Sequence, residues 1–313
     1  MNVFERKAIF SHNVPGVHGG KPEKFIEALR SGGFEAVYLK AADGTGVFRP
    51  NRVSFPLWGE NVKAELVAAL KRAGIAVIGW GFNYGNDPIG EANIAVSQAD
   101  RLQLDGWIFD VESVFERHAD HSRRALIIAS RFKEALPKLP TAFCSWALWW
   151  SPTSGAQWHP PAKAKPFMKY CDFGMPMMYW YTLDLDKNKA QLPAYEARAK
   201  WLHATSTQQW KRITDKPIIP VGRAYIGDGG VMTQGAMTAF EQSVRAAGQP
   251  GISWWVLDAA HKRPEWWQEL SVMPGFATSV GGDLSPQPSL PGGEEVSMEE
   301  RVDRLWKAHP EIW

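Results

Sequence analysis

Cysteine is nearly absent from this sequence, and so are dense runs of one charge and long apolar spans. The two cysteines, Cys144 and Cys171, lie in separate apolar segments without metal-ligand spacing, which excludes a disulfide scaffold and favours two buried thiols. The formal net charge is only +2 and no Lys/Arg run occurs, so nucleic acid is not an expected partner. No uncharged apolar span is long enough to cross a bilayer, so we expect no membrane span.

Targeting, phosphate-binding and metal motifs are missing as well. The N-terminal stretch M-N-V-F-E-R-K-A-I-F has no apolar h-region, so we expect a protein made without a signal peptide that stays cytoplasmic until something else releases it. The loop Val14–Gly20 has its glycines in the wrong order for a phosphate turn. His118, Asp120 and His121 form H-x-D-H without a third ligand at the usual spacing, which favours a solvated loop. We therefore expect neither a cofactor nor a metal.

Tryptophan is the abundant exception, with 16 Trp against 7 Tyr. The rest of the composition, 45% apolar and 22% charged, is that of an ordinary soluble globular protein. Two interpretations of the tryptophans stay open. They build the core, or they form flat apolar platforms for ligands such as sugars, because many of them lie at the ends of predicted strands.

Short apolar runs alternate with amphipathic stretches over residues 1–275. The runs predict eight strands, at Lys7–Phe10, Ala36–Ala41, Ala76–Phe82, Trp107–Glu112, Thr141–Leu148, Phe173–Trp180, Ile218–Tyr225 and Ile252–Asp258. The stretches between and after them predict eight helices, at Pro22–Ser31, Asn61–Ala73, Ile89–Leu102, Ser122–Leu136, Ala162–Tyr170, Ala190–Ile213, Gln234–Ala247 and Pro264–Leu270. This alternation predicts an α/β fold, a (β/α)8 TIM barrel. A doubly wound open sheet is the alternative, but it would require a Gly-rich phosphate turn after the first strand.

The composition changes after the predicted barrel. Residues 276–297 are rich in Gly, Pro and Ser, which predicts a flexible linker. Residues 298–313 predict one short helix with Val302, Leu305 and Trp306 as an apolar stripe. Alone it is too short to be stable, so we expect it to dock on its own barrel, to mediate self-association or to attach the chain to a larger assembly.

The stretch Gly106–Ser113, G-W-I-F-D-V-E-S, carries the strongest chemical signal. Alternate side chains of a strand share a face, so Asp110 and Glu112 point the same way with their Cα atoms roughly 6.5–7 Å apart. Unpaired buried charge is costly, so two acids at the end of a buried strand indicate a functional site. The alternative is structural, with Asp110 forming a buried ion pair with Lys40 or Arg223.

Aromatic and polar side chains follow the other predicted strands, at the edge where barrel enzymes carry their catalytic groups. Paired carboxylates with aromatic walls are what glycoside hydrolysis requires. We expect Glu112, nearer the rim, to be the protonated acid, and the deeper Asp110 to remain ionised as a stabiliser. The expected substrate-binding residues are His12, Lys40, Asp43, Trp80, Asn83, Tyr84, Trp146, Trp180, Arg223, Tyr225, Trp255 and Asp258.

Several motifs resemble those of known glycoside hydrolases. Lys40–Thr45 (K-A-A-D-G-T) and Gly74–Gly79 resemble the K-A-T-E-G-T and G-x-x-x-G pattern of family 25, the muramidases of bacteria and phages. Asp110-Val111-Glu112 is similar to the D-x-E of that family, which also occurs in family-18 chitinases. Met177-Met178-Tyr179 looks like the M-x-Y of the sixth chitinase strand.

The resemblance implies a retaining mechanism at N-acetylated sugars, with the acetamido group of the substrate as the nucleophile. Glu112 would then be the proton donor, Asp110 the residue that orients the acetamido group, and Tyr179 a nearby hydrogen-bond donor. The muramidases carry an acid at the end of the first strand, where this chain reads Ser11-His12-Asn13. Asp258 at the end of the eighth predicted strand is the acid that could replace it.

Three functions follow from these observations. The first is a glycoside hydrolase whose partner is a polysaccharide, namely bacterial cell-wall peptidoglycan, in the manner of a lysozyme or a phage or prophage endolysin. The second is a non-catalytic glycan-binding or structural barrel, for example in a phage particle. The third is a hydrolase or lyase that acts on another polysaccharide.

Overall fold

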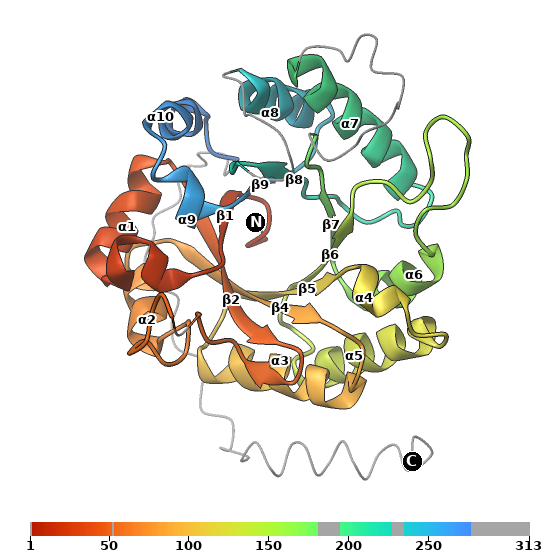
Figure 1. The fold of residues 1–313 in the computed structure, drawn as a ribbon, viewed down its shortest axis with the longest axis horizontal. Helices are drawn as coiled ribbons and strands as arrows, with labels where there is room; N and C mark the ends of the chain where they lie inside the picture. The colour runs from red at the N-terminus through yellow and green to blue at the C-terminus, as the bar shows by residue number, and fades with distance from the viewer. Residues whose placement is uncertain (1, 52, 181–194, 227–234, 277–313) are drawn as a thin grey trace.

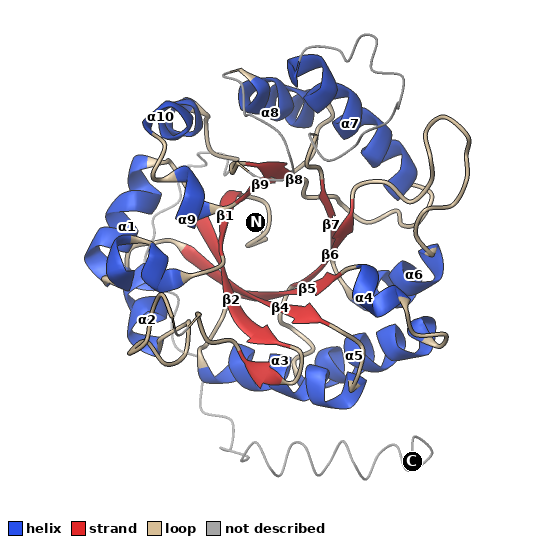
Figure 2. Cartoon of the chain, viewed as in Figure 1, coloured by secondary structure: helices blue, strands red, loops and turns tan. Residues whose placement is uncertain are grey.

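The computed structural model describes residues 2–51, 53–180, 195–226 and 235–276, and it shows a closed ring of strands surrounded by helices (Figures 1 and 2). Within these residues the ring consists of eight parallel strands, β1 (Lys7–Ser11), β2 (Ala36–Asp43), β4 (Ala76–Asn83), β5 (Gly106–Val111), β6 (Thr141–Trp146), β7 (Phe173–Met177), β8 (Val221–Arg223) and β9 (Ile252–Trp255). Neighbouring strands are hydrogen-bonded around the ring, and β1 pairs with both β2 and β9. The predicted (β/α)8 barrel is therefore confirmed.

The helices cover the outside of the ring, as Figure 2 shows. The main ones are α1 (Pro22–Ser31), α2 (Ala64–Arg72), α3 (Pro88–Arg101), α5 (His121–Ala135), α6 (Pro161–Tyr170), α7 (Tyr195–Trp210), α8 (Ala236–Ala246) and α10 (Pro264–Val272). None of the helices in the described part of the chain is both long and apolar enough to cross a membrane.

The sequence did not predict the short elements that follow the strands. These are β3 (Gly46–Val47), α4 (Ser113–Glu116), α9 (Leu257–Ala260) and two 3-10 turns at Val14–Gly16 and His18–Gly20. The predicted strands matching β6, β7 and β9 were too long at their carboxyl ends, because apolar residues continue past them into buried loops, whereas those matching β1, β2 and β4 ended one or two residues early. Asp258 consequently lies in α9 and not in a strand.

The chain end lies outside the described residues. The predicted helix at 298–313 and the predicted linker at 276–297, apart from Phe276, belong to this part of the chain. The backbone N–H of Phe276 donates to the Glu35 carboxylate at 2.9 Å.

The core has two layers, because successive strand residues point alternately inward and outward. On β5, Trp107 and Phe109 face the helices, whereas Ile108 faces the barrel interior. Phe4 is fully buried and closes the amino end of the barrel, with its ring 5.2 Å from that of Phe173. Asp110 follows Ile108 on the inward face, so the buried acid lies directly above an apolar floor.

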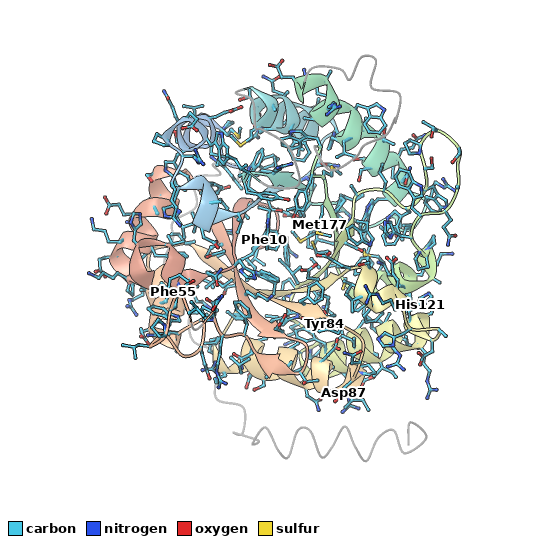
Figure 3. All side chains as sticks on the ribbon, viewed as in Figure 1. Phe10, Phe55, Tyr84, Asp87, His121 and Met177 are labelled. Atoms are coloured by element: carbon cyan, nitrogen blue, oxygen red, sulfur yellow. The ribbon has the colours of Figure 1, made fainter. Side chains whose placement is uncertain are left out.

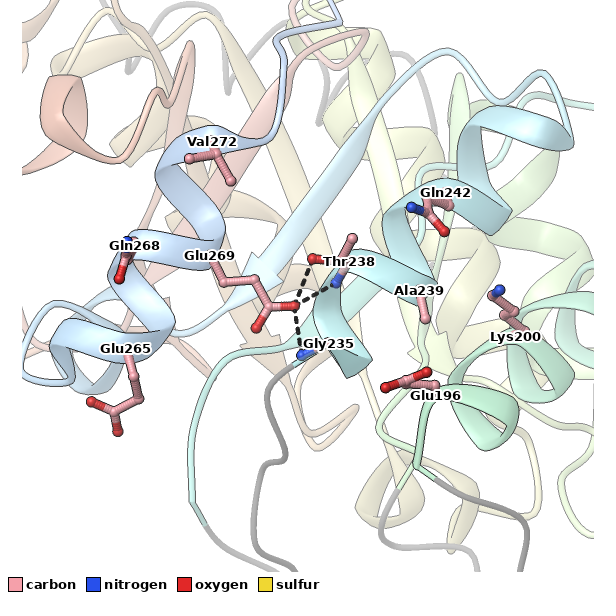
Figure 4. Close-up of a pocket in the computed structure, with 10 residues that line it drawn as sticks. All are labelled: Glu196, Lys200, Gly235, Thr238, Ala239, Gln242, Glu265, Gln268, Glu269 and Val272. Atoms are coloured by element: carbon pink, nitrogen blue, oxygen red, sulfur yellow. Dashed lines mark hydrogen bonds between the residues drawn. The ribbon is translucent and has the colours of Figure 1, made fainter.

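Helices α8 and α10 are joined by a carboxylate, as Figure 4 shows. Glu269 of α10 accepts hydrogen bonds from the backbone N–H groups of Gly235 at 3.2 Å and Thr238 at 2.8 Å, and from the Thr238 hydroxyl at 2.7 Å. These N–H groups belong to the first turn of α8, whose donors have no partner within the helix. Beside this contact, α7, α8 and α10 border a cavity of about 490 Å³.

Lys7 at the start of β1 connects this strand to α10 through hydrogen bonds. Its buried ammonium group donates to the carbonyl oxygens of Gly32 at 2.9 Å, Leu270 at 2.5 Å and Met273 at 2.9 Å. Gly32 follows α1, and Leu270 and Met273 are at the end of α10, where the Leu270 carbonyl also accepts the Met273 N–H at 3.2 Å. One side chain therefore bonds to carbonyl groups at the ends of both the first and the last α-helix described.

We expect Lys7→Met to lower the free energy of unfolding by about 2–4 kcal/mol, because it removes the buried donor that three carbonyl groups share. Denaturant unfolding followed by circular dichroism measures this change. Lys24→Met is the matched control, since Lys24 is exposed on α1 and, within the described ranges, bonds only to Glu27 on the same helix at 2.7 Å. A loss of stability no larger than in the control would contradict the role assigned to Lys7.

Candidate active site

A cavity of about 130 Å³ lies at the carboxyl ends of the barrel strands. The sequence predicted three of its residues as catalytic, Asp110, Glu112 and Tyr179, and a fourth, Trp255, as substrate-binding. Figure 3 shows two further members, Phe10 and Met177, near the centre of the ring of strands. Among the described residues the lining is Phe10, Asp110, Glu112, Cys144, Met177, Tyr179 and Trp255.

The two carboxylates occupy an environment that disfavours charge. Asp110 is 8% exposed, and its Oδ1 atom has no hydrogen-bond partner among the described residues. Burial and the neighbouring Glu112 carboxylate raise the pKa of Asp110 well above its usual range, while Lys40 opposes the shift. Burial also raises the pKa of Glu112, against the charges of Lys163 and Lys40. Both pKa values are thus raised, so the pair retains a proton at a higher pH than two free carboxyl groups would.

This environment differs from the expectation for Asp110. The sequence predicted the deeper acid as the ionised one, yet the deeper position is the more desolvated, with Ile108 below it. The alternative of a buried ion pair is not observed either. Within the described part of the chain Asp110 forms no ion pair, and Lys40 bonds instead to Asp43 at 3.1 Å.

Tyr179 and Trp255 form aromatic walls of the cavity. The ring of Tyr179 packs edge-on against Tyr225 with centroids 5.8 Å apart. The Trp255 ring lies 5.5 Å from both Phe10 and Trp80. The peptide bond between Trp255 and Val256 is cis.

His12, Lys40, Asp43 and Trp80 gather next to Trp255, on the side of β1 and β2. The His12 ring lies 5.9 Å from Trp80 and 6.2 Å from Trp255, and the Lys40 ammonium group is 5.0 Å from the Trp80 ring centroid. Burial, reinforced by the charge of Lys40, lowers the pKa of His12 to about 4. His12 is therefore neutral at pH 7. Its Nδ1 accepts from the Asn13 side-chain amide at 2.9 Å, which leaves Nε2 as the N–H donor.

Asn83 and Tyr84 at the end of β4 bond to two acids, the buried Glu91 of α3 and the partly exposed Asp43 of β2. The Asn83 amide donates to Glu91 at 3.1 Å, and the Tyr84 hydroxyl lies 3.5 Å from the Asp43 carboxylate. Asp43 also forms an ion pair with Lys40. The Tyr84 contact with Asp43 therefore joins the end of β4 to the end of β2. These contacts place Asn83 and Tyr84 next to the Lys40 group and not at the cavity itself.

Three of the predicted substrate-binding residues contact other parts of the protein and do not line the cavity. Trp180 is buried outside the strand ring, with its ring 5.2 Å from Phe240 of α8. Arg223 is 0% exposed and supports Tyr225, with its Nε donating to the Tyr225 carbonyl at 3.0 Å and its guanidinium 4.6 Å from that ring. None of Trp180, Arg223 and Tyr225 lines the cavity.

Asp258 also has a structural role in place of the predicted binding one. Its carboxylate accepts the backbone N–H groups of His12 at 3.1 Å and Asn13 at 3.2 Å. The acid from α9 therefore positions the loop after β1, where the sequence suggested it as a replacement for the missing acid of strand one. Asp258 bonds to that loop and is not among the residues that line the cavity.

Sequence reasoning missed Asn61, which positions the same region from the other side. Its fully buried amide accepts from the Val14 N–H at 2.9 Å and donates to the carbonyl oxygens of His12 at 3.1 Å and Lys40 at 2.8 Å. Asn61 was predicted as the start of a helix, and no local pattern reveals that it joins the loops after β1 and β2.

Glu116 is the most important residue that was missed, because it collects three donors beside the carboxylate pair. Its carboxylate accepts from Trp146 Nε1 at 2.9 Å, from His159 Nδ1 at 3.0 Å, and from the ammonium group of Lys163. Burial alone would raise the pKa of Glu116, but the bonds from His159 and Lys163 lower it to about 2. The one signal available in the sequence was its spacing, four residues past Glu112.

His118 lies in the turn before α5, and His121 is the first residue of that helix. His118 Nε2 lies 3.1 Å from the Tyr84 carbonyl, His121 Nδ1 lies 2.9 Å from the His118 carbonyl, and Asp120 bonds Arg124 at 2.5 Å. The described residues contain no group of three or more His, Cys, Asp or Glu placed to hold a metal ion. Cys144 and Cys171 are both buried free thiols.

Comparison with known proteins gives similarity in structure only. No family model and no curated protein matches the sequence. Active domain 2 of the chitinase from Pyrococcus furiosus superposes with a TM-score of 0.62 at 13% identity, over 86% of this chain and 94% of that domain. The chain shares the fold of these enzymes.

Two further structures support the same conclusion. A family-18 chitinase from Pseudoalteromonas aurantia gives a TM-score of 0.60 at 12% identity, over 85% of this chain and 98% of its own. The spore cortex-lytic enzyme SleL of Bacillus megaterium gives 0.54 at 10% identity, over 84% of this chain and 72% of its own. The barrel is thus one that glycoside hydrolases use, and the motif resemblance to family 25 is not confirmed by these comparisons.

Proposed function

We propose that this protein is a glycoside hydrolase that acts on a polymer of N-acetylated amino sugars. The observation that carries the proposal is the pair of carboxylates, the buried Asp110 and the half-buried Glu112, which line one cavity together with the aromatic rings of Tyr179 and Trp255. The structural relatives support it, since two of them are chitinases and the third is a spore cortex-lytic enzyme. We further propose peptidoglycan as the polymer.

In the proposed reaction Glu112 is the general acid. Burial raises its pKa, so that it holds a proton at a higher pH than a free glutamic acid and can deliver it to the glycosidic oxygen. As that C–O bond breaks, the carbonyl oxygen of the substrate acetamido group bonds to the anomeric carbon. Water then opens this cyclic intermediate, with the Glu112 carboxylate accepting the proton from the water.

Asp110 is proposed to orient the acetamido group. With the sugar bound, the proton that the pair holds lies on Glu112, and the ionised Asp110 accepts the acetamido N–H and stabilises the positive charge that the ring closure places on this nitrogen. Deep burial makes such a charge–charge contact strong, because little water screens it. Tyr179 is proposed to donate a hydrogen bond to the acetamido oxygen, and Trp255 to form an apolar surface for the sugar ring.

The test is the release of reducing sugar from purified peptidoglycan and from chitin oligosaccharides between pH 4 and 8. We expect release from peptidoglycan with a bell-shaped pH profile, in which the fall at high pH reports the loss of the Glu112 proton. Release from chitin alone would keep the enzyme class and change the polymer. Binding to either polymer without release would favour the non-catalytic glycan-binding barrel, and the absence of both would contradict the proposal.

A further inference from the structure

A second group of functional side chains lies directly beside the proposed proton donor. The pairing of β5 with β6 sets Asp110 opposite Cys144, so continuing by two residues sets Glu112 opposite Trp146. Ala142 and Cys144 face the barrel interior, and the two-residue period puts Trp146 on that same face. On this continued register Trp146 is the neighbour of Glu112 on the adjacent strand, just outside the lining of the cavity.

The Trp146 ring is held in a stack. It lies parallel to the His159 imidazole, with centroids 4.7 Å apart and an interplanar angle of 17°. The loop that carries His159 is itself fixed, because the backbone N–H groups of Trp158 and His159 donate to the Trp149 carbonyl at 2.9 and 3.2 Å. Gln209 of α7 in turn accepts the Trp149 N–H at 2.7 Å.

One carboxylate anchors both rings of the stack. Glu116 accepts from the indole N–H of Trp146 and from Nδ1 of His159, and it forms an ion pair with Lys163. Lys163 is 0% exposed, and its ammonium group also lies 5.4 Å from the Trp149 ring centroid. A buried ion pair of this kind loses its hydration and adds little to the free energy of unfolding. We therefore look for its role in the position that it gives to the two rings.

We propose that Glu116 and Lys163 are positioning residues that hold Trp146 and His159 as a platform for the sugar on the leaving-group side of the scissile bond. This inference rests on the proposed function, in which Glu112 protonates the oxygen between two sugars. The sugar in the cavity contacts Asp110, Tyr179 and Trp255, so the sugar that leaves lies beyond Glu112, where Trp146 stands. A rigid indole face is the surface on which the apolar face of a sugar ring packs.

The test compares two sets of variants with oligosaccharides of three to six N-acetylglucosamine units. Trp146→Ala removes the platform, and we expect about a tenfold increase in KM with a smaller change in kcat. Glu116→Gln combined with Lys163→Met removes both buried charges together and should raise KM to a similar extent. Trp201→Ala on the outer surface of α7, 37% exposed, is the matched control and should leave KM unchanged.

A double-mutant cycle tests whether Glu116 acts through Trp146. If it does, adding Trp146→Ala to the Glu116→Gln/Lys163→Met variant should raise KM little further, whereas independent sites would multiply their effects. Trp146→Phe keeps an aromatic ring and loses the bond to Glu116, so it should raise KM several-fold and remains informative if the charge-free variant does not fold. Multiplicative effects, or an unchanged KM in Trp146→Ala or Trp146→Phe, would overturn the inference.

Binding in the Glu112→Gln background separates this inference from the proposed function. Calorimetry with the same oligosaccharides needs no turnover, and Trp146→Ala in that background should weaken binding by about tenfold. If the wild-type protein hydrolyses the oligosaccharides but Trp146→Ala binds them as tightly as its parent, the platform is wrong and the function stands. If the wild-type protein neither binds nor hydrolyses them or peptidoglycan, the proposed function fails, and the platform with it.

Discussion

Glu112→Gln is expected to lower kcat for sugar release by roughly 10²–10⁴-fold, because general acid catalysis contributes about that much. Glutamine has nearly the same shape and still lines the cavity, but it has no proton to give to the leaving oxygen. Affinity for the oligosaccharide should stay within a few-fold of wild type, since the aromatic walls are unchanged. Reducing-sugar release measures the first quantity, and calorimetry measures the second.

The matched control for this variant is Glu65→Gln on the exposed side of α2. Both substitutions remove one carboxylate, so a loss confined to Glu112→Gln assigns the effect to the cavity. A Glu112→Gln protein that retains wild-type kcat would show that another group protonates the leaving oxygen. Equal losses in both variants would point to a general effect of charge.

Asp110→Asn is expected to produce opposite effects on activity and on stability. Activity should fall by roughly 10²-fold or more, because the amide cannot supply the negative charge that the developing cation requires. The folded protein should nevertheless become more stable at pH 7, because the variant removes a carboxyl group whose charged form is disfavoured by burial and by Glu112.

The pH dependence of this gain follows from the direction of the pKa shift. The pKa of Asp110 is raised in the folded protein above the 3.8 of a free group, so the folded state binds more protons between the two values. Wild-type stability therefore falls as the pH rises through that window, and the asparagine variant avoids this fall. The gain should be near zero close to pH 4 and grow toward neutral pH.

Thermal unfolding at several pH values measures this effect, with roughly 2–4 °C of Tm for each kcal/mol. Asp215→Asn is the control, because Asp215 is exposed after α7 and should show no such trend. A Tm that is lower than wild type at neutral pH would show that the Asp110 charge is stabilised by its surroundings. The predicted loss of activity and the predicted gain in stability are measured separately, so either measurement alone can contradict its part of the prediction.

The outcome for the individual tryptophans shows how far sequence reasoning reaches. Trp107, Trp149 and Trp210 proved to be core residues, whereas Trp146 and Trp255 are half-buried at the carboxyl ends of their strands. The same residue type at similar positions was consistent with both roles. A strand period assigns a face to each side chain, but it does not say how much of that face a neighbouring loop or helix covers.

The sequence by itself determined the barrel and the direction of its two acids. Alternating apolar runs and amphipathic stretches specify strands and helices locally, and a two-residue spacing puts Asp110 and Glu112 on one face whatever surrounds them. Only the tertiary structure decided which groups meet that face. Glu116, Trp146, His159 and Lys163 come together because neighbouring strands and their loops end at one edge of the barrel. Asp258 accepts backbone N–H groups, and the pKa of Asp110 is raised before a sugar binds, because closing the ring sets distances and burial that no local pattern contains.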